Sequence, residues 1–159
     1  MNRKLRTIGH ALLAALGFFV LSACKPARPP PPLPPDAPPP EVIAAALAQL
    51  PAPYSSGDYL AGRRVFLRCR GCHLIQKDAG DRVGPNLHGV YGRASGSEAG
   101  FAYSPAMLGA NRIWDGPSLD AFLANPRENL PGTRMGFIGL RDAEERRDVI
   151  AYLRVESVR

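Results

Sequence analysis

The segment Cys69-Arg70-Gly71-Cys72-His73 combines residue types and a spacing that can support chemistry. On one helical turn, thiols at positions i and i+3 can reach the two vinyl groups of one porphyrin, and the imidazole of the next residue lies beneath the iron. This C-x-x-C-H pattern therefore predicts covalent attachment of a c-type haem through Cys69 and Cys72, with His73 as an axial ligand.

Two other uses of the same residues are open at this point. A zinc site needs four ligands, and the residues from Tyr54 onward add only His88 and no second C-x-x-C pair. A thiol oxidoreductase would carry its cysteine pair after a strand and at the start of a helix, and no strand pattern precedes Cys69. The sequence favours haem over both alternatives.

A second axial ligand has three candidates in the same part of the chain, namely Met107, Met135 and His88. Met135 lies in a turn-rich loop 62 residues after His73, where the backbone can wrap over the far face of a haem. Met107 suits ordinary core packing in a segment, Tyr103 to Leu108, that we expect to be a short loop, and His88 follows the cysteines too closely to cross to the opposite face. Met135 is therefore the favoured ligand.

Helices are the elements that must position these ligands, since the C-terminal part has no Val, Ile or Thr alternation long enough for a sheet. Ser56 or Asp58 can cap a first helix that leads into the cysteines, and Pro117 suits the first turn of a second. Asp142 and Glu145 form a capping-box pattern for the last helix. The apolar positions are Leu60, Val65, Phe66 and Cys69, then Leu119, Phe122 and Leu123, then Val149, Ile150 and Leu153.

Two long, glycine-containing loops, 80–100 and 129–139, lie between these helices. Short helices bury too little surface to hold about forty loop residues in place, so a group other than side chains should fill the core. The predicted fold class is therefore all-α, with short helices and long loops wrapped around one covalently bound haem.

The N-terminal residues have the features of an export signal. Three basic residues precede the apolar stretch 8–21, which is shorter than the roughly 18 to 20 residues that cross a bilayer comfortably. The sequence Leu21-Ser22-Ala23-Cys24 resembles the lipobox of bacterial lipoproteins, which implies cleavage before Cys24 and acyl chains on it. An uncleaved membrane helix is the alternative. Either way we expect a membrane-attached protein that faces the periplasm.

Proline dominates the next segment, with ten of the 17 prolines between Pro26 and Pro40. Such a segment should be extended polyproline II, and at about 3.1 Å per residue it would hold the following domain some 45 Å from the bilayer. Residues 41–50 are alanine-rich and can form a short helix. The predicted domains are a signal peptide at 1–23, a lipid-anchored cysteine and linker at 24–53, and a haem domain at 54–159.

The net charge of +6 is evenly divided, because residues 1–53 hold five basic and two acidic side chains and the remainder holds fifteen and twelve. No run of Lys and Arg is longer than two residues, and aromatic residues do not interleave with basic clusters. These features argue against a nucleic-acid partner.

Residues 54–159 resemble class I cytochromes c of the mitochondrial and bacterial c2 type. Many motifs match in the same order, so the resemblance is specific. It implies the class I cytochrome c fold and a one-electron carrier with one covalent haem c, not an enzyme. The matching segments are Val65-Phe66, Cys69 to His73, 83–93, 100–104, Trp114, 123–126, Pro131 to Met135 with Phe137, and 150–153.

The resemblance also implies roles for individual residues. His73 and Met135 are the implied axial ligands, and the Pro85 carbonyl is implied to hold His73. Phe122 replaces a tyrosine of the mitochondrial pattern and Met107 an asparagine, which puts the redox potential and the strength of the Met135 bond in question. The residues implied to lie near the haem propionates are Arg93, Tyr103, Trp114 and Thr133, and those implied to pack on the last helix near Val149 and Tyr152 are Gly62 and Phe66.

A haem with an imidazole on one side and a thioether on the other has no open position for a substrate. We therefore expect a monomeric, membrane-tethered electron carrier between a quinol:cytochrome c reductase and a terminal oxidase or photosynthetic reaction centre. A labile Met135 would instead favour a peroxidase or a ligand sensor. A purely structural lipoprotein would leave the C-x-x-C-H motif unexplained.

The family resemblance further implies that redox partners meet an exposed haem edge near Phe137 through a basic ring. Acidic residues gather at the start of the last helix, so the domain should be an electric dipole that orients the haem edge toward an acidic partner. The ring positions are Arg63, Arg68, Arg82, Arg127, Arg134 and Arg141, and the acidic ones are Asp142, Glu144, Glu145 and Asp148.

Overall fold

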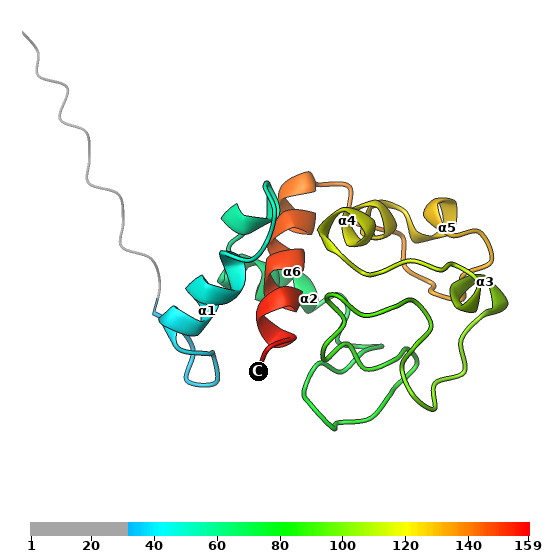
Figure 1. The fold of residues 1–159 in the computed structure, drawn as a ribbon, viewed down its shortest axis with the longest axis horizontal. Helices are drawn as coiled ribbons and strands as arrows, with labels where there is room; N and C mark the ends of the chain where they lie inside the picture. The colour runs from blue at the N-terminus through cyan, green and yellow to red at the C-terminus, as the bar shows by residue number, and fades with distance from the viewer. Residues whose placement is uncertain (1–31) are drawn as a thin grey trace, which may run out of the picture. The chain divides into compact units, whose positions relative to one another are not determined.

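The computed structural model describes residues 32–159, so the predicted signal segment and Cys24 lie outside the described residues. This part of the chain is helical, and its extended backbone pairs at an isolated antiparallel bridge between Ala94 and Ile113. None of its helices is long and apolar enough to cross a bilayer. The elements are α1 Pro40–Leu47, the 3₁₀ helix η1 Tyr54–Ser56, α2 Tyr59–Phe66, α3 Pro105–Leu108, α4 Gly116–Ala124, α5 Pro126–Asn129 and α6 Ala143–Glu156 (Figure 1).

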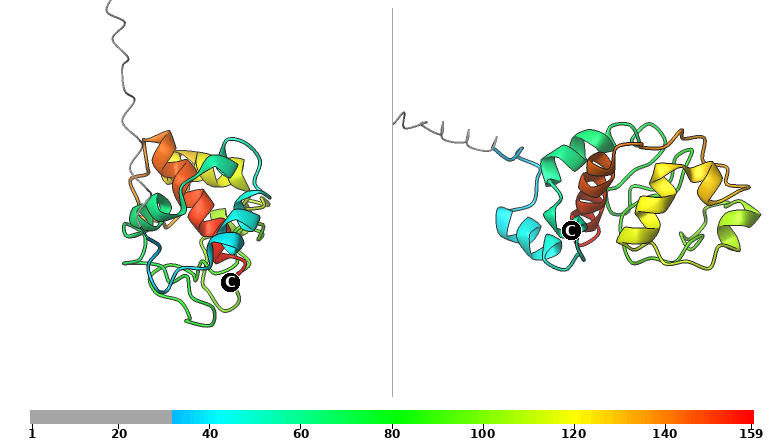
Figure 2. Two further views of the ribbon diagram at one scale, coloured as in Figure 1. Left: turned by 90° about the vertical axis from the view of Figure 1, so that its left-hand side faces the viewer. Right: turned by 90° about the horizontal axis from the view of Figure 1, so that it is seen from above.

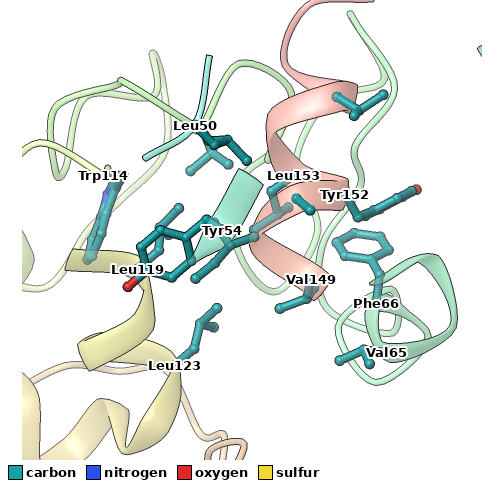
Figure 3. Close-up of a cluster of buried hydrophobic side chains, with 14 of the residues drawn as sticks. Leu50, Tyr54, Val65, Phe66, Trp114, Leu119, Leu123, Val149, Tyr152 and Leu153 are labelled. Carbon is teal, nitrogen blue, oxygen red and sulfur yellow. The ribbon is translucent and has the colours of Figure 1, made fainter. Parts of the chain in front are cut away.

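Helix α6 is the centre of the core, with side chains of α2 on one side of it and side chains of α4 on the other (Figure 3). Its residues Val149, Ile150 and Leu153 are at most 4% exposed, which confirms the apolar face predicted for the last helix. The view from above shows α6 lying between α1 on one side and α4 and α5 on the other (Figure 2, right). This helix therefore fixes the positions of the segments that carry the site.

The contact between α2 and α6 depends on a close backbone approach. A Cβ atom at Gly62 would lie 2.0 Å from the carbonyl oxygen of Asp148, so a side chain there would push the helices apart. Beside this contact the rings of Phe66 and Tyr152 lie 5.2 Å apart, centroid to centroid. Apolar burial and ring packing of this kind dominate core energetics, so α2 is held where it delivers the chain to Cys69.

Helix α4 begins where its sequence predicts. The Asp115 side chain accepts from the Ser118 amide, the Ser118 hydroxyl accepts from the Asp115 amide, and both distances are 2.9 Å. Pro117 lies in the first turn, where no amide donor is needed. The buried residues Leu119, Phe122 and Leu123 then face the core, as predicted.

The capping of α6 differs from its prediction. The Asp142 carboxylate accepts from the Glu144 amide at 2.7 Å, so Asp142 is the N-cap. The predicted capping box with Glu145 is wrong, because both carboxylate oxygens of Glu145 pair with the guanidinium of Arg68 instead, one of them at 2.7 Å. The pairing partner comes from the turn after α2, which a local sequence pattern does not include.

Residues 33–53, predicted from sequence as part of a linker, pack on residues 54–159 and are called the N-terminal strap below. The folded unit begins at Leu33. The chain turns where the Ala37 amide donates to the Pro34 carbonyl at 2.9 Å, so this part departs from extended polyproline II. Ala46 and Leu50 are 3% and 5% exposed in the core, and α1 contacts α6. Apolar residues spaced among the prolines supply this packing.

The strap is also held by polar contacts at its start. The Asp36 carboxylate pairs with the guanidinium of Arg63 on α2 at 2.7 Å, and the Asp36 carbonyl accepts from Arg159 at 2.9 Å. Ion pairs at the surface contribute little by themselves. They nevertheless fix the first turn of the strap beside the C-terminal end of α6.

Residues 105–108, expected as a loop, form the short helix α3. Ser104 is its N-cap, because the Ser104 hydroxyl accepts from the Met107 amide at 3.2 Å, and Pro105 lies in the first turn. Ser followed by Pro is a helix-start pattern. The Met107 side chain is half-buried and packs against the core, as expected for it.

Candidate haem-binding site

The C-x-x-C-H segment lies on a helical turn that follows α2. The Cys69 amide donates to the Phe66 carbonyl at 2.8 Å. The amides of Cys72 and His73 both donate to the Cys69 carbonyl, each at 3.0 Å. The two thiols and the imidazole are thus held within the single turn that haem attachment requires.

The two thiols have unequal surroundings. Cys69 is half-buried and Cys72 is exposed. Burial raises the pKa of the Cys69 thiol to about 11. A catalytic cysteine pair in an oxidoreductase needs a lowered thiol pKa, so this environment disfavours that alternative. Among residues 32–159, no three His, Cys, Asp or Glu side chains cluster into a metal site of the kind that the zinc alternative needs.

The imidazole of His73 is fixed by two neighbours. Its Nδ1 lies 2.7 Å from the carbonyl oxygen of Pro85, the contact that the family resemblance implies. A Cβ atom on Gly84 would lie 2.2 Å from His73 Cε1, so the ring packs directly on the glycine backbone. Burial lowers the pKa of His73 despite this hydrogen bond, so the neutral imidazole donates from Nδ1 and keeps Nε2 for a metal.

Asn86 closes the loop that presents Pro85 to the imidazole. Its side chain is buried, and Nδ2 donates to the carbonyls of Gln76 at 3.0 Å and Gly80 at 3.1 Å. Its backbone amide donates to the Asp81 carboxylate at 2.7 Å. These contacts place the Pro85 carbonyl without any regular secondary structure.

Hydrogen bonds link the segments that carry the implied propionate residues. The Trp114 amide donates to the Arg93 carbonyl at 2.9 Å, so these two residues are neighbours. The Arg134 guanidinium donates to the Ala102 carbonyl, so the loop that contains Thr133 lies beside the segment that contains Tyr103. Burial raises the pKa of the Tyr103 phenol.

Met135 lies in a loop whose two ends are tied to the helices. The Thr133 amide donates to the Leu130 carbonyl at 3.0 Å, at the end of α5. The Leu140 amide donates to the Leu123 carbonyl on α4 at 2.8 Å. Arg146 of α6 donates to the Leu140 carbonyl at 2.9 Å. The Met135 side chain is half-buried against the core, so its thioether is available inside the domain.

Phe122 and Met107, the two departures from the family pattern, both face the core. The Phe122 ring is 6% exposed and lies 5.0 Å from the ring of Trp114, centroid to centroid. An apolar ring at this position supplies packing but no hydroxyl group.

The donor set fits a c-type haem. Two thiols lie on one turn with the imidazole, and the imidazole has its Nδ1 occupied by a carbonyl and its Nε2 left for iron. The close packing of Gly84 on the ring leaves the imidazole little freedom to turn away. Cys69, Cys72 and His73 would hold the group, and Met135 stays the predicted further ligand.

Sequence reasoning alone did not identify Gly84 and Asn86 as parts of this site. Both lie next to Pro85 in the segment Gly84-Pro85-Asn86, whose turn-forming residue types signal a constrained loop. The types do not show that the loop folds back on the His73 ring, because that contact joins residues 11 positions apart.

The predicted docking residues have different surroundings. Arg63 pairs with Asp36, Arg68 pairs with Glu145, and Arg82 donates to the Arg70 carbonyl at 3.1 Å. Arg68 lines one groove with the acidic residues of α6, so its charge is largely neutralised there. The ring residues with exposed side chains and no carboxylate partner among residues 32–159 are Arg82, Arg127, Arg134 and Arg141, and Phe137 is half-buried.

Comparison with curated proteins finds relatives whose sequences this chain matches over nearly their whole length. A cytochrome c from Guizotia abyssinica is 42% identical over 114 residues, which is 71% of this chain and 99% of the relative. A cytochrome c2 from Rhodomicrobium vannielii is 41% identical over 112 residues, 70% of this chain and 90% of the relative. No family model matches the chain.

A solved structure agrees with these relatives. It is cytochrome cH from Methylobacterium extorquens, with 39% sequence identity and a TM-score of 0.58. The alignment covers 61% of this chain and 97% of that one. The arrangement of helices and loops is therefore shared as well as the sequence.

Proposed function

Since the chain belongs to the class I cytochrome c family, whose members carry electrons on one covalently bound haem c, we propose that it is a membrane-tethered carrier with His73 and Met135 as axial ligands. When bound, the haem supplies the one-electron chemistry of its iron. The observation that carries the proposal is the contact between His73 Nδ1 and the Pro85 carbonyl, because it orients Nε2 as a ligand.

The chain's own residues set the conditions for electron transfer. The Pro85 carbonyl accepts from His73, which makes the imidazole a stronger donor. The thioether of Met135 would stabilise the reduced state of the iron. If both His73 and Met135 bind the iron, the site leaves no position for a substrate, as a carrier requires.

The ligand assignment is tested by comparing Met135→Ala with Met107→Ala. A coordinated methionine gives the oxidised protein a weak far-red absorption band and blocks carbon monoxide binding to the reduced protein. Met135→Ala should keep covalent haem, lose the band and bind carbon monoxide, whereas Met107→Ala should resemble the wild type. A band that survives in Met135→Ala would assign the ligand to another residue. Carbon monoxide binding by the wild type would favour the peroxidase or sensor.

The membrane attachment is supported by the lipobox-like sequence that ends at Cys24 and by the prolines that follow it. In a bacterium that processes lipoproteins, the wild type should take up labelled fatty acid and partition into detergent, and Cys24→Ser should not take up the label. A wild-type protein that stays in the membrane unlabelled, with its first residues intact, would support the uncleaved helix.

The proposed partners are membrane complexes on the periplasmic side. A quinol:cytochrome c reductase would donate the electron, and a terminal oxidase or photosynthetic reaction centre would accept it. Tethering raises the effective concentration of the carrier near such complexes. The test follows oxidation and reduction of this haem in isolated membranes while each complex is inhibited in turn. If no inhibitor changes the fraction of reduced haem, the proposed partners are wrong.

A further inference from the structure

The loop that presents Pro85 to His73 is held from behind by the guanidinium of Arg93. This side chain donates to the carbonyl of Asn86 at 2.9 Å and to the carbonyl of His88 at 3.2 Å. Asn86 is the residue directly after Pro85. The guanidinium therefore holds the carbonyl of the residue that follows Pro85, whose own carbonyl accepts from His73.

Arg93 is itself held by a carboxylate. Its guanidinium forms an ion pair with Glu98, and the two side chains are 19% and 27% exposed. Solvent therefore screens the attraction between these two charges less than it would for a surface pair, so Glu98 holds the Arg93 guanidinium more firmly. Among residues 32–159, Glu98 is the carboxylate that pairs with Arg93.

We propose that Glu98 is a positioning residue for the axial ligand His73, acting through Arg93 and the Pro85 carbonyl. Glu98 fixes the guanidinium, the guanidinium fixes the Asn86 and His88 carbonyls, and this backbone fixes the acceptor of the His73 Nδ1–H. The inference rests on the proposed role of His73 as an iron ligand. It adds a residue, 25 positions later in the chain, that sets the strength of that ligand.

The expected consequence is on the redox potential. A short, well-aligned hydrogen bond to the Pro85 carbonyl makes the imidazole more basic and favours the oxidised iron. Without Glu98 the guanidinium gains freedom, the acceptor loosens, and the oxidised state loses part of this support. The reduction potential should then rise.

The test compares Glu98→Gln and Arg93→Lys in the full-length, haem-loaded protein. Glu98→Gln removes the charge partner, and Arg93→Lys keeps the charge but replaces a planar fork with a single ammonium group that cannot serve three acceptors alike. In both variants, exchange of the His73 Nδ1 proton with solvent, followed by NMR of the reduced protein, should accelerate roughly tenfold. Glu98→Gln should also raise the reduction potential.

Glu144→Gln is the matched control, because it removes the same charge from a side chain that is 73% exposed and lies outside this network. It should leave the proton exchange and the potential at their wild-type values. A higher potential in Glu98→Gln with unchanged exchange in both variants would show a charge effect at a distance and overturn the positioning role. Unchanged values of both quantities would overturn it as well.

The same NMR spectra separate this inference from the proposed ligation. A methionine bound over the haem ring gives a strongly upfield-shifted methyl resonance in the reduced wild type. If that resonance is absent, the ligand assignment has failed. If it is present and proton exchange is insensitive to Glu98, the assignment stands and only the positioning role has failed.

Discussion

At the scale of single residues, the His73 ring is packed closely against the backbone of Gly84 and Pro85. Gly84 covers one of its edges and the Pro85 carbonyl fixes Nδ1. If His73 binds the iron as proposed, a ring held this closely would need little reorganisation when the iron changes charge, which suits a carrier. The same tight packing makes the ring sensitive to a single added methyl group.

Gly84→Ala should therefore destabilise the holoprotein by about 1–3 kcal/mol, as overpacking commonly does. The new Cβ would lie 2.2 Å from His73 Cε1, so the ring or the loop must move. Gly71→Ala is the control, because nothing lies within 4 Å of its Cβ position. Denaturant unfolding of both variants measures the difference. Equal stability of the two variants would mean that the loop at Gly84 can move away from His73 at no cost, and would contradict the tight packing.

The arrangement of the site residues could be predicted where local spacing or the family resemblance defines it. Cys69, Cys72 and His73 form a motif within five residues, and Pro85 followed from the family resemblance. The ion pair of Glu98 with Arg93 could not be predicted, because it depends on how a loop without periodic structure folds. The pairing of Arg68 with Glu145 was missed for the same reason, since 77 residues separate them.

At the scale of elements, the contact of α2 with α6 buries a group of tyrosines. The Tyr59 hydroxyl donates to the Glu156 carboxylate at 2.8 Å, and the rings of Tyr59 and Tyr152 lie 5.4 Å apart. Burial raises the pKa of Tyr152 to about 12, and Glu156 adds to the effect. Neutral phenols are therefore part of what joins the two helices.

The stability of this helix pair should fall at alkaline pH. The folded pKa of Tyr152 is raised, so its contribution is present below the ordinary value of about 10 and is lost as the pH rises toward about 12. The loss should reach about 2–3 kcal/mol for this residue. Denaturant titrations give the free energy of unfolding at each pH between these values. This free energy should fall less steeply with pH in Tyr152→Phe than in the wild type. Parallel curves would contradict the burial of this phenol.

The helices themselves were mostly predictable, because apolar periodicity and capping residues are local signals. α4 and α6 have the predicted buried faces, and Asp58 caps α2, where its carboxylate accepts from the Ala61 amide at 2.8 Å. α3 was expected as a loop because four residues are too few to show periodicity. The packing of α1 on α6 was hidden by the surrounding prolines, which indicate a spacer by composition.

At the scale of the whole molecule, the N-terminal strap is part of the folded domain. Leu50→Ala should lower the free energy of unfolding by about 2–4 kcal/mol, because the side chain is 5% exposed in the core. Leu108→Ala, at a residue that is 58% exposed, should change it far less. Chemical denaturation of the holoprotein compares the two. An unaffected Leu50→Ala would show that residues 33–53 act only as a spacer.

The distribution of charge also acts on the molecule as a whole. Arg127 is exposed, whereas Arg68 is neutralised by Glu145, so the two should not contribute alike to docking. Arg127→Gln should slow electron transfer to an acidic partner at low salt more than Arg68→Gln does, and the difference should fade at high salt. Stopped-flow rates over a series of ionic strengths give the comparison. Equal effects would contradict the neutralisation of Arg68.

Because the folded unit begins at Leu33, the segment that could link it to a lipid anchor at Cys24 is short. If Cys24 carries the lipid, only residues 25–32 remain between the anchor and the folded domain. At the same value of about 3.1 Å per residue, eight residues would reach about 25 Å, against the roughly 45 Å expected for the whole proline segment. The volume swept around the anchor falls with the cube of this reach, by about sixfold, and the local concentration of carrier rises by the same factor. A carrier tethered this closely would exchange electrons with its immediate neighbours in the membrane, so its turnover should depend on how densely those neighbours are packed.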